Sequence, residues 1–306
     1  MAAALLLPAR FALYADLMAL FGLVFFPLYV LGSGSPLPLP LRGIALGGAL
    51  AGLVLSAFLT LLLVAGMAGV GLAEVDRASI AIVLFETAAG KAILWRSGLL
   101  ATLLAVSLWP GAFGPLRTLA AACLSAAALA TLAWGGHAAA QEGAGASFYL
   151  AADVVHLSAG ATWFGALIAF SWLLLRASPD EAETVAALQA ALARFSLVGT
   201  LLVAAILATG LVNSWALVGI DHVSSLVSAT YGRVLLAKIG LFAAMLGLAA
   251  LNRFRLTPAL GRGLAKDDAA PALASLQRSL ALETGAALAI VALVAWLGTL
   301  SPIAEG

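Results

Sequence analysis

The sequence predicts an all-α fold, a polytopic membrane helix bundle of about eight transmembrane helices. Hydrophobic residues make up 64% of the 306 residues and charged residues only 9%, and the mean hydropathy is +1.12. Soluble domains contain roughly 45–50% apolar and about 25% charged residues, so this chain has too few polar side chains to cover a soluble body of its size. We therefore expect a single integral membrane domain over residues 1–306, surrounded by the lipid bilayer.

Eight apolar runs have the length that a membrane crossing requires, about 20 residues for a hydrocarbon core of about 30 Å. A further apolar stretch, residues 79–89, is too short to span and predicts a partial or interfacial helix. The first run is expected to be retained, because residues 1–7 lack the basic start of a signal peptide. The eight runs cover residues 11–31, 43–66, 91–109, 117–136, 148–175, 195–217, 232–251 and 280–300.

The charges between the runs predict the orientation, because Lys and Arg are retained on the cytoplasmic side. One side receives nine basic residues and the other receives six, and the segment 252–278 carries the largest group. We assign the more basic side to the cytoplasm. Both termini then lie on the outer side of the membrane.

Two ten-residue segments suggest duplication of a four-helix unit. Residues 90–99 and 232–241 both begin with glycine and a basic residue, and both end in Gly-Leu. Each has a second basic residue six positions after the first glycine, Arg96 in one segment and Lys238 in the other. The offset places the third span against the seventh, as in a parallel repeat. Both long side chains are expected to extend to the outer interface.

Charge and cysteine content exclude several classes of protein. The formal net charge of +1 gives no basic excess for nucleic acid. The one cysteine, Cys123, excludes a disulfide or a thiolate cluster within one chain. The sequence has no Gly-Lys-Ser/Thr phosphate loop, so ATP-driven pumping by this chain is excluded. We do not expect an enzyme.

The three histidines fall at or near the predicted outer face. His137 ends the fourth span, His156 lies about two turns into the fifth, and His222 follows the sixth. Imidazole is a ligand for Cu, Zn, Fe and Ni. The alternative is that a histidine at this position is simply solvated at the interface, which applies more to His222 than to His137. Asp153 shares a helix face with His156 and could fix its tautomer by a hydrogen bond.

Other candidates have weaker support. Trp163 follows His156 by two helical turns and either packs between helices or lines a pathway. Among the methionines, Met67 is favoured as a soft copper ligand because the predicted second span ends near it on the outer side. Glu283 enters the last span from the cytoplasmic side, where we expect Arg253 or Arg255 to pair with it.

An ordered set of short motifs resembles the CopD family of bacterial inner-membrane copper resistance and uptake proteins. The match is close over residues 134–302 and rests on hydropathy alone before that. It begins with Gly136-His137 and with the segment 153–165, which contains Asp153, His156 and Trp163. The later motifs are Arg194-Phe195-Ser196, Thr209-Gly210, Thr230-Tyr231-Gly232 with Lys238, Asn252-Arg253 with Leu256 and Pro258, Arg278-Ser279 with Glu283, and Ser301-Pro302.

The resemblance implies copper movement across the inner membrane, often alongside a periplasmic CopC-like copper-binding protein. The expected function is copper transport or transfer in copper homeostasis or resistance, with Cu(I) or Cu(II) taken up at a periplasmic histidine site. That site comprises His137, His156 and His222 as ligands, with Asp153 as a hydrogen-bond partner that orients His156. Two alternatives remain at this point: a haem or redox protein with histidine axial ligands, and a copper-responsive scaffold that transports nothing.

Overall fold

The computed structural model describes residues 2–31, 37–135, 145–218, 225–266 and 268–301, and every regular element within them is a helix. Eight of these helices are long and apolar enough to cross a membrane, which confirms the predicted fold class. The eight are α1 (Ala2–Tyr29), α2 (Leu41–Ala68), α4 (Ala88–Leu108), α5 (Pro115–Ala130, continued by the 3-10 helix η2, Thr131–Gly135), α6 (Ala146–Arg176), α7 (Ala182–Val218), α9 (Thr230–Leu251) and α11 (Ala270–Leu297).

Short helices connect the long ones. The segment expected to be a partial helix forms α3 (Arg77–Glu86), with the side chain of Asp76 accepting a hydrogen bond from the backbone N–H of Ser79 at its start. The other short elements are η1 (Leu72–Glu74), α8 (Ser225–Ser228), the π-helix η4 (Asn252–Leu256) and α10 (Thr257–Leu264). Helix α7 starts thirteen residues before the predicted span. Its first turns contain polar residues, but apolar residues continue among them at helical spacing.

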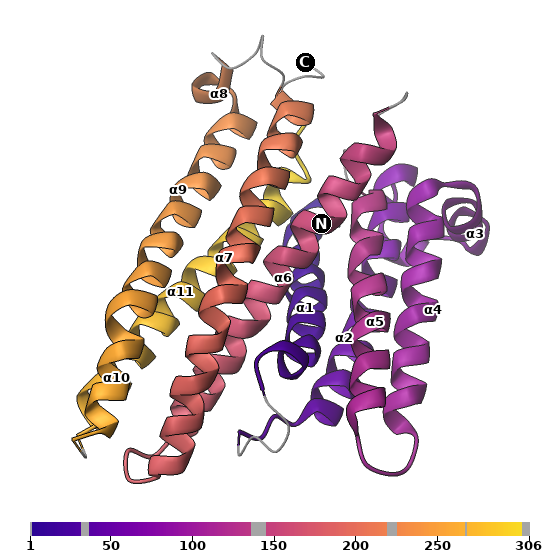
Figure 1. Ribbon diagram of the computed structural model, residues 1–306. Coiled ribbons are helices and arrows are strands. Elements are labelled where there is room, and N and C mark those ends of the chain that lie inside the picture. The colour runs from indigo at the N-terminus through magenta and orange to yellow at the C-terminus, as the bar shows by residue number, and fades with distance from the viewer. Residues whose placement is uncertain (1, 32–36, 136–144, 219–224, 267, 302–306) are drawn as a thin grey trace.

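The two halves of the chain repeat one arrangement. Helices α1 and α6 pack against each other in the middle of the bundle, with α3, α4 and α5 on one side and α7, α9 and α11 on the other (Figure 1). In the first half α1 packs against α2 and α5, and α4 packs against α3 and α5. In the second half α6 packs against α7 and α11, and α9 packs against α8 and α11.

Two glycines of the repeated segments have the same structural role. A Cβ on Gly90 would meet the backbone of α3 at Val83 and Leu84, and a Cβ on Gly232 would meet the backbone of α8 at Leu226. Each glycine therefore lets a short helix fold back onto the start of a long one. This shared contact and the shared packing order support the duplication that the sequence suggested.

One difference between the halves lies beside the candidate site. Helices α2 and α4 pack closely in the first half, whereas α7 and α9, their counterparts, hardly touch in the described part of the chain. The space between α7 and α9 continues into the centre of the bundle as a cavity. The second half is therefore open where the first half is closed.

Arginines at the more basic end bind backbone carbonyls at the ends of helices. The Arg42 guanidinium donates to the carbonyl of Ser107 at 2.9 Å, and Arg194 donates to the carbonyl of Val30 at 3.2 Å. Arg117 donates to the carbonyls of Trp109 and Pro110. Cations favour helix C-terminal carbonyls that lack a partner, so these charges stabilise this end of the bundle in addition to any effect on orientation.

Candidate metal-binding cavity

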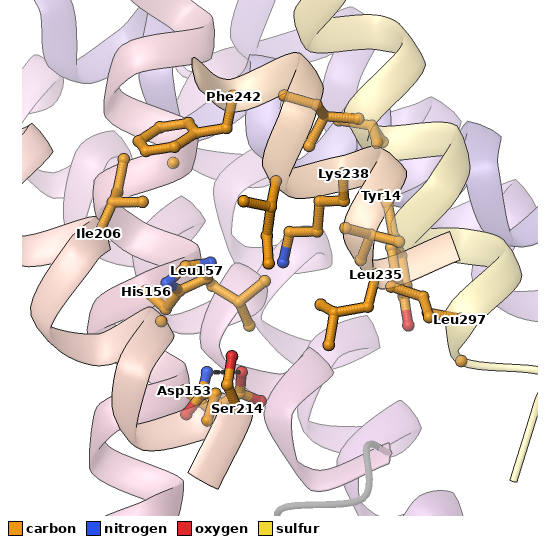
Figure 2. Close-up of a pocket in the computed structure, with 18 of the residues that line it drawn as sticks. Tyr14, Asp153, His156, Leu157, Ile206, Ser214, Leu235, Lys238, Phe242 and Leu297 are labelled. Atoms are coloured by element: carbon orange, nitrogen blue, oxygen red, sulfur yellow. Dashed lines mark hydrogen bonds between the residues drawn. The ribbon is translucent and has the colours of Figure 1, made fainter. Parts of the chain in front are cut away.

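A cavity of about 430 Å³ lies among α1, α6, α7, α9 and α11. Most of its lining is apolar, and a few polar side chains enter it from different helices, as is typical of ligand sites. Figure 2 shows Asp153 and His156 of α6 and Lys238 of α9 at this cavity. The other polar lining residues are Arg10 and Tyr14 of α1, Tyr149 of α6, Asn213 and Ser214 of α7, and Tyr231 of α9.

The hydrogen bonds of His156 fix its tautomer. Its Nδ1 lies 3.0 Å from Oγ1 of Thr209, on the neighbouring α7. The Thr209 hydroxyl already donates its proton to the carbonyl of Ala205, at 2.6 Å. Oγ1 can therefore only accept, so Nδ1 carries the imidazole proton and Nε2 keeps a free lone pair. A neutral imidazole in this form can bind a metal ion through Nε2.

Asp153 does not make the hydrogen bond to His156 that the sequence suggested. One of its carboxylate oxygens accepts from Nδ2 of Asn213 at 3.3 Å, while Thr209 holds the imidazole. Both partners belong to α7, because His156 and Asp153 point across the α6–α7 contact rather than toward each other along α6. The group that contacts the imidazole of His156 is therefore the hydroxyl of Thr209 and not the carboxylate of Asp153.

Lys238 is the residue that sequence reasoning misplaced. Its side chain reaches from α9 into the cavity on the side of His156 and Asp153 (Figure 2), and its ammonium interacts electrostatically with both. It does not extend to the outer interface. The repeat that pairs Lys238 with Arg96 was the sequence feature that could have indicated a buried position. Arg96 is also buried, at 6% exposure, and donates a hydrogen bond to the hydroxyl of Thr131 at 2.9 Å.

The methionines at the cavity are not the one that the sequence favoured. Met67 is 65% exposed at the end of α2 and is not among the lining residues. Met18 of α1 and Met245 of α9 line the cavity instead. A Cβ placed on Gly160, one helical turn beyond His156, would lie 3.6 Å from the methyl group of Met18. Two thioethers and one imidazole therefore border the same space.

Trp163 lies at the cavity wall. It is 4% exposed and packs edge-to-face against Phe242 of α9, with ring centroids 5.9 Å apart. Packing and pathway lining were the two alternatives for this residue, and its position is compatible with both.

His137 and His222 lie outside the described residues, so their part in the site remains a prediction. Among the residues that the structure describes, no three His, Cys, Asp or Glu side chains gather as a metal site would require.

Glu283 does not pair with an arginine as expected. It is 1% exposed, and its Oε1 accepts a hydrogen bond from Nδ2 of Asn252, in the π-helix η4. Arg253 donates to the hydroxyl of Thr200 instead. The π-helix turns Asn252 toward α11 and leaves Arg253 and Arg255 exposed.

Comparison with known proteins gives a consistent result. The family profile described as "Copper resistance protein D" matches residues 189–297, and the profile "Copper resistance protein D-like, N-terminal domain" matches residues 1–148. Copper resistance protein D of Pseudomonas syringae pv. tomato is 40% identical over 97% of this chain and 96% of its own length. The inner membrane protein YebZ of Escherichia coli (strain K12) is 28% identical over 81% of each chain. No solved structure matches the chain.

Proposed function

Because the chain belongs to the copper resistance protein D family, we propose that this multi-pass inner-membrane protein carries copper across the membrane and so contributes to copper resistance or homeostasis. The cavity between α7 and α9 holds the copper ion during passage. Copper is the substrate here and not a resident cofactor.

The observation that carries this proposal is the donor set around the cavity. His156 offers Nε2, because Thr209 keeps the proton on Nδ1. Met18 and Met245 offer thioether sulfur from two further helices. Soft sulfur donors and imidazole suit Cu(I), whereas Mg²⁺ and Ca²⁺ favour oxygen donors. Of the two oxidation states that the sequence left open, this donor set favours Cu(I) over Cu(II).

The periplasmic part of the proposal rests on sequence. His137 and His222 receive copper at the outer face and pass it to His156, and a CopC-like protein supplies it there. The excess of basic residues at the opposite face supports this orientation, and the resemblance of the residues around His137 and His156 to the family supports this partner.

Anaerobic Cu(I) binding to the purified protein tests the proposed site. We expect His156→Ala to remove most of the bound copper, and Met18→Leu and Met245→Leu each to weaken binding, because a site of two to four ligands tolerates no loss of a strong one. Met67→Leu is the matched control, since Met67 is exposed and away from the cavity, and it should bind as the wild type does. Unchanged copper content in His156→Ala would refute the site.

Removal of the Thr209 hydroxyl should also weaken copper binding. In Thr209→Val the Nδ1–H of His156 loses its acceptor, so the ring is free to rotate and to exchange tautomers. We expect a loss of about 10- to 100-fold in copper affinity, the usual cost of removing a partner that orients a metal ligand. Thr209→Ser keeps the hydroxyl and should restore most of the affinity. Equal affinities for the valine and serine variants would show that the hydrogen bond has no part in binding.

A further inference from the structure

A second polar cluster is buried where α9 ends and α11 begins its span. It consists of Asn252, Ser279 and Glu283, which are 8%, 5% and 1% exposed. Asn252 opens the π-helix η4, a local widening of the helix that is frequent at functional sites. Ser279 and Glu283 are one helical turn apart on the same face of α11. None of the three contributes to the cavity lining.

This cluster has oxygen atoms without partners. Nδ2 of Asn252 donates to Oε1 of Glu283, but Oδ1 of Asn252 and Oγ of Ser279 are both buried with no hydrogen-bond partner. Such atoms cost free energy unless something donates to them. A proton on the Glu283 carboxyl adds an O–H donor to the cluster, in which two oxygens have no hydrogen-bond donor.

No positive charge balances Glu283 within the described part of the chain. The arginines of α6, α7, η4, α10 and α11 are all exposed, and Glu183 of α7 is exposed as well. Arg10 of α1 and Lys238 of α9 line the cavity instead. The Arg194 guanidinium donates to the carbonyl of Val30, and that of Arg176 stacks on Trp172. A carboxylate with one neutral donor is costly at membrane depth. The exposed arginines are Arg176, Arg194, Arg253, Arg255, Arg262 and Arg278.

The cluster continues the line of the cavity toward the other membrane face. Met245 and Ala287 line the cavity. Glu283 lies four residues from Ala287 along α11, and Asn252 lies seven residues from Met245 along α9, so both pairs share a helix face. At 1.5 Å per residue the first offset is about 6 Å and the second about 10 Å. The cluster therefore lies just beyond the cavity along both helices.

We propose that Glu283 is a proton-carrying site on the inner half of the copper path, and that it releases its proton when a copper ion arrives. The O–H bond of the carboxyl breaks, the proton passes to water in the cavity on the outer side, and the carboxylate neutralises the positive charge of the ion. When copper moves on to the inner side, a proton from water on that side binds and restores the neutral carboxyl. Each passage of Cu(I) thus exchanges one proton for one positive charge. The coupling rests on the proposed function, but the protonation of Glu283 does not.

Infrared spectroscopy of the purified full-length protein tests the protonation directly. We expect the spectrum at neutral pH to contain a carboxylic-acid C=O band that Glu283→Gln removes. Glu86→Gln is the control, since Glu86 is exposed at the end of α3, and it should leave the band unchanged. If Glu283→Gln folds poorly, Ser279→Ala serves in its place and should shift the frequency of the band. A wild-type spectrum without the Glu283 band would overturn the proposal.

Copper flux into proteoliposomes tests the coupling. With Cu(I) as the probe and a pH-sensitive dye inside, the wild type should move protons opposite to copper, and Glu283→Gln should lose that proton movement while still binding copper. Proton movement that persists in Glu283→Gln overturns the proposal. If the wild type moves no copper at all, the proposed transport function is refuted. The infrared result then still decides whether Glu283 carries a proton.

Discussion

Gly22→Val is expected to prevent assembly of the bundle. Gly22 of α1 and Gly165 of α6 cross in direct backbone contact: a Cβ on Gly22 would meet the carbonyl of Ala161 and lie 2.7 Å from Cα of Gly165. Both contacts involve backbone, which cannot move aside without separating the two central helices. An extra methylene in a packed core costs about 1–3 kcal/mol, and the valine side chain adds three carbon atoms here. We expect little folded protein in size-exclusion chromatography, and Gly165→Val should behave similarly.

Gly47→Ala provides the matched control for this prediction. Gly47 lies on α2, where a Cβ would have no neighbour within 4 Å. Alanine favours a helix over glycine by about 0.8–1.0 kcal/mol, so thermal unfolding of this variant should occur at or above the wild-type temperature. A folded, stable Gly22→Val protein would mean that α1 and α6 do not cross as described.

Substitutions at Asp153 and Lys238 are expected to change copper affinity in opposite directions. The Lys238 ammonium opposes a copper cation bound at His156, and the Asp153 carboxylate offsets that charge. Lys238→Met should therefore tighten Cu(I) binding. Asp153→Asn should weaken it by about 10-fold or more, which corresponds to about 1.4 kcal/mol. Titration with a competing Cu(I) chelator at fixed pH measures both changes.

The double variant tests whether the two charges act through each other. If Asp153 acts by offsetting Lys238, then Asp153→Asn should cost much less in a Lys238→Met background than in the wild type. Equal costs in the two backgrounds would indicate that Asp153 acts on copper by another route. Asn213→Ala is a useful further variant, because its amide donates to Asp153 and it carries no charge of its own.

The sequence by itself determined the eight spans, because a bilayer requires long apolar runs and the chain has no other way to bury so many apolar residues. It also determined the short helix before the third span. The histidine within the fifth span could be singled out, since an ionisable group at such a position is costly and rare. The family relationship followed from motifs in order along residues 134–302, and the comparisons extend it over nearly the whole chain.

The partners of each polar side chain were decided only by the tertiary structure. Helical spacing relates Asp153 to His156 along one helix, but the partners that both residues take lie on α7, more than fifty residues away. Lys238 and Arg96 occupy equivalent positions in the repeat. Lys238 reaches an open cavity because α7 and α9 are apart, whereas Arg96 is buried in a half whose helices are closed. Such contacts depend on how helices pack across the bundle, and the apolar pattern of each span does not encode that.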